Sequence, residues 1–145
     1  DAPSTLTRLL NMGVPAFNVA SAVHLIVAQR LARKLCVNCK EPTQLPDRVL
    51  IQAGFKAEEI GTFTIYQAYE KGCTNCTNGY KGRSGIFQVM PISPKIKAMI
   101  MEGCTENEIE LSAAEDGILD LRASGLAKIK EGVTSLEEIE RVTNV

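Results

Sequence analysis

The sequence has 145 residues, of which 45% are hydrophobic and 23% are charged. This is an ordinary composition for a globular chain that forms one domain, with or without a small satellite. The net charge is −1 and the cations are scattered except around residues 30–34. This argues against a nucleic-acid-binding surface, which needs a basic face. No run of 18 uncharged apolar residues occurs, so no membrane-spanning helix is predicted.

The start of the chain is predicted to be helical. Asp1 can cap a helix whose apolar face consists of Leu6, Leu9 and Leu10 and which ends at Gly13. The first residue is not methionine, and no basic-then-apolar leader precedes this helix. We therefore expect the sequence to be part of a longer protein.

A long helix is predicted over residues 18–35, because this segment is apolar on most faces until Arg30, Arg33 and Lys34. The three cations would then lie in the last turn, where they suit the negative end of the helix dipole. A second role for Arg30 and Arg33, contact with a neighbouring subunit or a nucleotide, stays open. His24, the only histidine, is interpreted as a structural residue in the middle of this helix.

Two Cys-x-x-Cys pairs are the most specific feature of the sequence. Cys36 and Cys39 form the first pair, Cys73 and Cys76 form the second, and 33 residues lie between the pairs. Two intervening residues allow both sulfurs of a pair to point at one centre, and two pairs supply the four thiolates of a structural zinc site. The sequence therefore predicts that these four cysteines bind Zn²⁺.

Other roles for the cysteines are less favoured. Four thiolates also bind iron, and this alternative stays open. Disulfides fit poorly with an odd count of five cysteines, and a redox pair would be expected beside a βαβ unit, which the sequence lacks. The fifth cysteine, Cys104, is isolated and is interpreted as a packed thiol, not as a fifth ligand.

Between and after the cysteine pairs, short strands and helices are predicted. A short helix is expected over residues 47–53 with Gly54 as its stop, and strands are expected over residues 62–66 and 83–92. The metal would then clamp the base of a small β element.

From Ser93 onward the chain is predicted to be helical. Ser93 and Pro94 begin a helix that ends at Gly103, and capping boxes at residues 105–108 and 135–138 begin later helices. The predicted fold class is therefore mainly α with a small β insertion (α+β). Three glycines are expected to separate the last helices, and three glutamates are interpreted as a solvated acidic run: Gly117, Gly125 and Gly132; Glu137, Glu138 and Glu140.

The phosphate-binding motif G-x-x-x-x-G-K-[ST] is absent from the sequence, in which no glycine is followed by lysine. No catalytic residue and no nucleotide-binding residue are therefore predicted within these 145 residues. Gly79, Gly82 and Gly85 are interpreted as turn residues around the second cysteine pair.

Several motifs together resemble the traffic ATPases, the motors of type IV pilus assembly and of type II secretion. They lie at residues 29–36, 72–87, 121–128 and 132–138, and residues 1–3 resemble the segment that follows the histidine box of this family. The likeness covers essentially the whole chain. Residues 38–40 and 90–93 are more similar to the pilus branch. Gln88 departs from the glutamate that is usual in the family.

The resemblance implies a hexameric, cytoplasmic, RecA-like ATPase that works against a platform protein of the inner membrane and drives pilin polymerisation. Its ATP- and Mg²⁺-binding residues would precede residue 1, so no hydrolysis is expected from this piece alone. Residues 1–35 would end the RecA-like core, residues 36–92 would form the zinc subdomain, and residues 93–145 would form a C-terminal helical bundle.

The implied partners are neighbouring subunits of a homohexamer and the platform protein, without nucleic acid and without membrane insertion. Two alternatives stay open: a part of a type II secretion ATPase, and a free-standing zinc-ribbon binding module.

Overall fold

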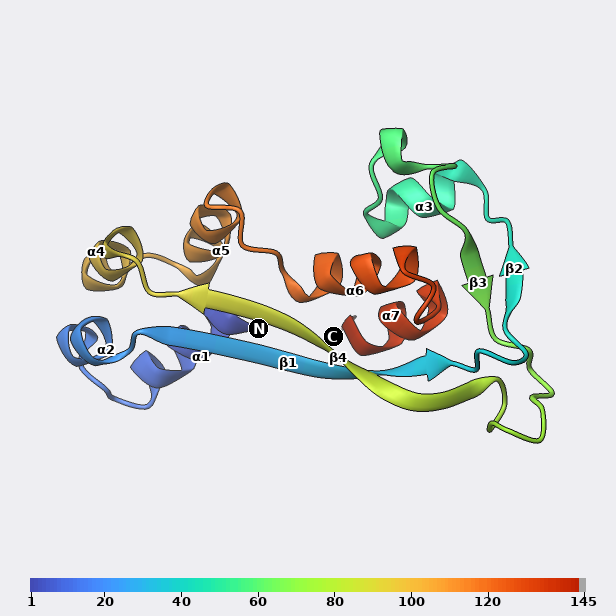
Figure 1. The fold of residues 1–145 in the computed structure, drawn as a ribbon. Coiled ribbons are helices and arrows are strands. Elements are labelled where there is room, and N and C mark those ends of the chain that lie inside the picture. Colours follow the sequence, from blue (N-terminus) through green and yellow to red (C-terminus); the bar gives the residue numbers. More distant parts are fainter. Residues whose placement is uncertain (144–145) are drawn as a thin grey trace. The chain divides into compact units, whose positions relative to one another are not determined.

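The computed structural model describes residues 1–143, which form two compact units (Figure 1). The first unit consists of Asp1–Gln29 and Phe87–Leu121, and the second consists of Arg30–Ile86 and the segment from Arg122 onward. Helices hold 45% of the residues and strands hold 21%, so the predicted α+β class is confirmed. Within residues 1–143, no helix combines the length and the apolar character that a membrane crossing requires.

Four helices and the adjoining strand ends form the first unit. Helices α1 (Ala2–Asn11) and α2 (Ala16–Ala22) pack against α5 (Glu106–Glu115) and α4 (Pro94–Glu102), respectively. Their facing apolar side chains exclude water and form one hydrophobic core. The largest fully buried side chains of this core are Leu6, Val19, Met90, Ile96, Ile100 and Ile109.

The predicted caps of these helices are confirmed. The Asp1 carboxylate accepts a hydrogen bond from the Ser4 N–H at 2.8 Å, and the Ser93 hydroxyl accepts one from the Ile96 N–H at 3.2 Å. A reciprocal capping box begins α5, and Gly103 ends α4 in the left-handed conformation (φ 76°) that glycine adopts without a steric penalty.

The predicted helix over residues 18–35 is wrong. Helix α2 ends at Ala22, Val23 is extended, and strand β1 (Leu25–Leu35) follows and pairs with β4 (Tyr80–Pro91). The two strands run antiparallel (Figure 1), with the Ile92 N–H donating to the His24 carbonyl at 2.9 Å. Within the first unit, Ile26 is buried while its neighbours Leu25 and Val27 are each 53% exposed, as expected for alternating strand residues.

Because residues 25–35 form a strand and not a helix, the sequence interpretations of His24 and of the three cations as parts of a helix are wrong. His24 directly precedes β1 and is exposed, so it is not a residue in the middle of a helix. The cations Arg30, Arg33 and Lys34 lie on β1 and therefore cannot interact with the dipole of a helix end.

A second, short sheet lies in the second unit. Strands β2 (Glu41–Thr43) and β3 (Ile65–Gln67) pair antiparallel, and their connection contains α3 (Asp47–Ala53) and the 3₁₀ turn η1 (Ala57–Glu59). The predicted helix over residues 47–53 is confirmed, as is a strand within residues 83–92. The strand predicted over residues 62–66 begins only at Ile65.

Two helices end the described chain, α6 (Leu121–Lys130) and α7 (Leu136–Thr143). Gly117 and Gly132 flank α6 as predicted, but Gly125 lies inside it, so its predicted role as a helix boundary is wrong. Close packing explains this glycine, because a Cβ atom added there would lie 2.7 Å from Ile139 Cγ2.

We expect Gly125→Ala to destabilise the protein although alanine favours helices. The forced contact with Ile139 costs about 1–3 kcal/mol, more than the gain of about 1 kcal/mol from helix propensity. Urea unfolding of the purified protein measures the difference. In an Ile139→Ala background the same change should cost less, because the atoms that clash are gone. Equal or higher stability of the single variant would contradict this packing.

Candidate metal centre

The four cysteine sulfurs of the two pairs lie together, all within 4.8 Å of one another. The Sγ–Sγ distances are 3.7 Å between Cys36 and Cys73, 3.6 Å between Cys39 and Cys76, and 3.6 Å between Cys73 and Cys76. A tetrahedron with Zn–S bonds of about 2.3 Å has edges of about 3.8 Å. The sulfurs are therefore spaced as the ligands of one metal ion are, and all four are free thiols.

Backbone hydrogen bonds position each pair. The Cys73 N–H donates to Cys76 Sγ at 3.2 Å, so a backbone donor of the second pair faces one of its sulfurs. The first pair directly follows β1, and the Cys36 N–H donates to the Gly79 carbonyl at 2.8 Å, which brings the two knuckles together. Gly79 is required there, because a Cβ atom would lie 2.7 Å from the Tyr69 carbonyl oxygen.

The electrostatics of the four thiols favour a bound cation. Burial raises the pKa of the Cys36 thiol, but hydrogen bonds with the backbone of Asn38 and Cys39 outweigh it and lower the pKa to about 7. Burial and the neighbouring thiols raise the pKa of Cys39. A divalent cation at the centre would stabilise the ionised form of all four sulfurs.

A fully buried carboxylate, that of Glu138, holds the strand end that leads to the first knuckle. It accepts hydrogen bonds from the Arg33 backbone N–H at 2.6 Å, from Arg33 Nη2 at 3.0 Å and from Arg141 Nε at 2.8 Å. Beside it, the Leu35 N–H donates to the Val133 carbonyl at 2.8 Å. The start of α7 and the loop before it are therefore anchored to the end of β1.

The interpretation of Glu138 as part of a solvated acidic run is wrong, although its neighbour Glu137 is exposed as predicted. Burial raises the pKa of Glu138, but hydrogen bonds from Arg141 and Arg33 outweigh it and hold the pKa at about 2. The one sequence signal for its special position is the capping box of residues 135–138. Half of that box is present, since the Glu138 N–H donates to the Ser135 hydroxyl at 3.1 Å.

Tyr80, Ser135 and Arg141 belong to the same network. Of these, the sequence predicts a role only for Ser135, as a helix cap. The Arg33 guanidinium lies 4.2 Å above the centre of the Tyr80 ring, and the Tyr80 hydroxyl lies 2.7 Å from the Ser135 hydroxyl. No local pattern marks Tyr80 or Arg141, because their partners lie on other elements. The guanidinium of Arg33 therefore contacts residues of its own chain, Tyr80 and Glu138.

The remaining singled-out residues lie apart from the cysteines. Gln88 is 3% exposed, and its side-chain oxygen accepts a hydrogen bond from the Ala2 N–H at 2.9 Å, which anchors the start of α1. Cys104 packs against the core of the first unit and is not part of the four-cysteine group. Arg30 is exposed on β1.

Comparison with known proteins agrees with the resemblance. Residues 1–141 match the family model described as type II/IV secretion system protein. Over 98% of its length, the chain is 53% identical to the type IV pilus assembly ATPase PilB of Pseudomonas aeruginosa, and over 96% it is 44% identical to that of Myxococcus xanthus. The type II secretion system ATPase E of Vibrio cholerae is 34% identical. The chain spans about a quarter of the length of these relatives.

We expect Glu138→Gln to lower the free energy of unfolding by about 2–3 kcal/mol at neutral pH, because a neutral amide then faces two guanidinium groups. Glu138 has an ordinary pKa of 4.5 and a folded-state pKa of about 2. Its stabilisation is therefore fully present above pH 4.5 and is lost as the pH falls from there toward 2.

Urea unfolding at several pH values tests this. The difference in unfolding free energy between wild type and Glu138→Gln should be constant above pH 4.5 and should narrow as the pH falls from 4.5 toward about 2. Glu137→Gln, an exposed neighbour, is the matched control and should change stability by less than about 0.5 kcal/mol. Equal stabilities of the two variants would refute the buried network.

Proposed function

Because the chain belongs to the type II/IV secretion system protein family, we propose that it is the zinc-bearing, force-transmitting part of a hexameric ATPase that powers type IV pilus assembly. The observation that carries this proposal is the pattern of identities. Relatives named as type IV pilus assembly ATPases are 53%, 50%, 44%, 38% and 35% identical, while those named for type II secretion are 34% identical, so the highest identities are to pilus ATPases.

In this proposal the residues that hold Zn²⁺ are Cys36, Cys39, Cys73 and Cys76. The spacing of their sulfurs supports it, and so does the N–H···S contact within the second pair. A shell of four thiolates is closed and has no position for a substrate, so the metal would be structural. Iron with the same four ligands is the alternative.

The metal would hold together the two ends of the segment between the cysteine pairs, which contains β2, α3 and β3. Structural zinc contributes on the order of 10–16 kcal/mol in small zinc-binding peptides. The buried Glu138 network holds the neighbouring strand end to α7. A part of a protein that transmits force must be rigid. The metal and the Glu138 network would each fix the same short segment, which supports this role.

ATP and Mg²⁺ would bind outside these 145 residues, which contain no phosphate-binding loop. Residues 1–35 would end the RecA-like core, 36–92 would form the zinc subdomain, and 93–145 would form the C-terminal helical part. The partners would be the adjacent subunits of a homohexamer and the platform protein of the inner membrane. The chain would contact the platform protein from the cytoplasmic side of that membrane.

Two other functions are less well supported. A type II secretion ATPase has the same family features, but its named representatives share fewer residues with this chain. A free-standing zinc-ribbon module that binds nucleic acid would require a basic face, whereas the net charge is −1.

We predict that the purified, reduced chain contains about one zinc ion, as measured by elemental analysis. Cys73→Ser should abolish retention of the ion and lower the melting temperature, because three thiolates no longer close the shell. Cys104→Ser should keep the full metal content and is the matched control. Protein that contains neither zinc nor iron would refute the metal site.

We also predict that the 145-residue chain does not hydrolyse ATP in the presence of Mg²⁺, because no backbone loop is available to hold the phosphates. Phosphate release from the chain, with a complete family member as the positive control, measures this. Hydrolysis that persists after repeated purification and titrates with Mg²⁺ would place the active site within these residues and overturn the assignment.

A further inference from the structure

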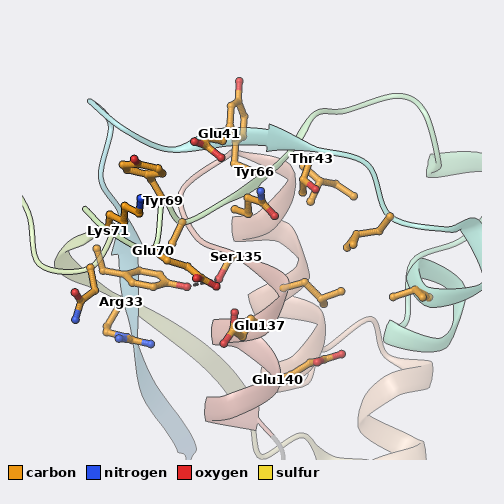
Figure 2. Close-up of a pocket in the computed structure, with 18 residues that line it drawn as sticks. Arg33, Glu41, Thr43, Tyr66, Tyr69, Glu70, Lys71, Ser135, Glu137 and Glu140 are labelled. Atoms are coloured by element: carbon orange, nitrogen blue, oxygen red, sulfur yellow. Dashed lines mark hydrogen bonds between the residues drawn. The ribbon is translucent and has the colours of Figure 1, made fainter. Parts of the chain in front are cut away.

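The second unit contains a cavity that the proposed function does not use (Figure 2). Its volume is about 700 Å³, within the range of pockets that bind ligands. The walls come from β2, β3, residues 68–71 and the first two turns of α7. Figure 2 shows Glu137 and Glu140 on α7 below the β2–β3 pair, which carries Glu41 and Tyr66.

Part of the lining is apolar. Ile65 and Leu136 are buried at 7% exposure each, and the half-buried side chains of Leu45 and Val49 lie with them. Apolar groups of an occupant would cover the part of these side chains that is still exposed. We therefore expect the occupant to carry apolar groups.

The charged part of the lining is acidic. Four carboxylates line the cavity, those of Glu41, Glu70, Glu137 and Glu140, against two cations, Arg33 and Lys71. The Arg33 guanidinium is already engaged by the buried Glu138, and Glu140 lies 3.8 Å from Arg122. Glu41, Glu70 and Glu137 are exposed and form none of the ion pairs found in residues 1–143. A positively charged occupant would complement these carboxylates.

The aromatic side chains of the cavity favour cations as well. Two of its three tyrosines already hold a cation of the same chain over the ring. Arg33 lies 4.2 Å from the centre of the Tyr80 ring, and Lys40 Nζ lies 4.2 Å from that of Tyr66. The third ring, Tyr69, is 38% exposed at the cavity wall beside Glu70. Tyr69 therefore offers an exposed ring to an ammonium or guanidinium group, in a cavity that carboxylates also line.

We propose that this cavity binds a segment of a partner protein that presents lysine or arginine side chains next to apolar ones. The carboxylates and Tyr69 would receive the cations, and the apolar lining would receive the neighbouring side chains. This inference rests on the cavity alone and stands whether or not the chain is part of a pilus motor.

Fluorescence anisotropy with the zinc-loaded 145-residue chain tests the proposal. The probe is a short labelled peptide of alternating lysine and leucine. Its controls are the same peptide with glutamate for lysine, and with serine for leucine. We expect saturable binding of the first peptide that weakens as salt is added, and much weaker binding of both controls.

Variants of the chain locate the binding. Replacement of Glu41, Glu70 or Glu137 by glutamine should each weaken binding up to about fivefold, and the triple variant should weaken it on the order of tenfold or more. Glu58→Gln, an exposed change of equal charge in the same unit but outside the cavity, should leave binding unchanged.

Three results would overturn the proposal: no saturable binding, binding by the triple variant as tight as by wild type, or equal binding of the serine-containing peptide. Displacement of the probe by spermidine as effectively as by unlabelled peptide would also overturn it, because charge alone would then suffice.

Discussion

Four thiol sulfurs within 4.8 Å of one another are the constraint on which the second unit depends. Four thiolates this close repel one another strongly, and a divalent cation at their centre turns that repulsion into attraction. In the sequence, 33 residues lie between the two cysteine pairs. This segment contains only short strands and helices, and its two ends come together where the four sulfurs lie. The buried apolar side chains of this segment are few, Leu50, Ala53, Phe55 and Ile65, and a metal is a common way to stabilise so small a core.

The buried carboxylate of Glu138 is the second anchor. Desolvation of a charge is costly, and here two guanidinium groups and a backbone N–H offset that cost. Because the carboxylate accepts from the backbone of Arg33 three residues before Cys36, the position of α7 and that of the first knuckle are linked. A movement of one would therefore be passed to the other, which is the property expected of a part that transmits force.

Features that depend on residues close in the sequence, such as helix caps and the cysteine pairs, are predictable from the sequence. Contacts between segments far apart in the sequence are not. The caps at Asp1 and Ser93 depend on residues within one turn, and the cysteine spacing has a chemical meaning of its own. The segment of residues 25–35 is predicted to be helical because the strand that pairs with it, β4, begins 45 residues after it ends and leaves no local signal. Gly125 and Glu138 were misread for the same reason: the close approach of Ile139 and the guanidinium of Arg33 appear only when distant segments pack.

X-ray absorption at the zinc edge of the purified chain tests the central claim most directly. Four cysteine ligands predict a single shell of four sulfur atoms at about 2.3 Å, with no nitrogen or oxygen ligand. In Cys104→Ser protein this shell should be unchanged. A shell that contains nitrogen or oxygen, or fewer than four sulfurs, would contradict a closed structural site. It would also contradict the proposal that the metal holds the two cysteine pairs together.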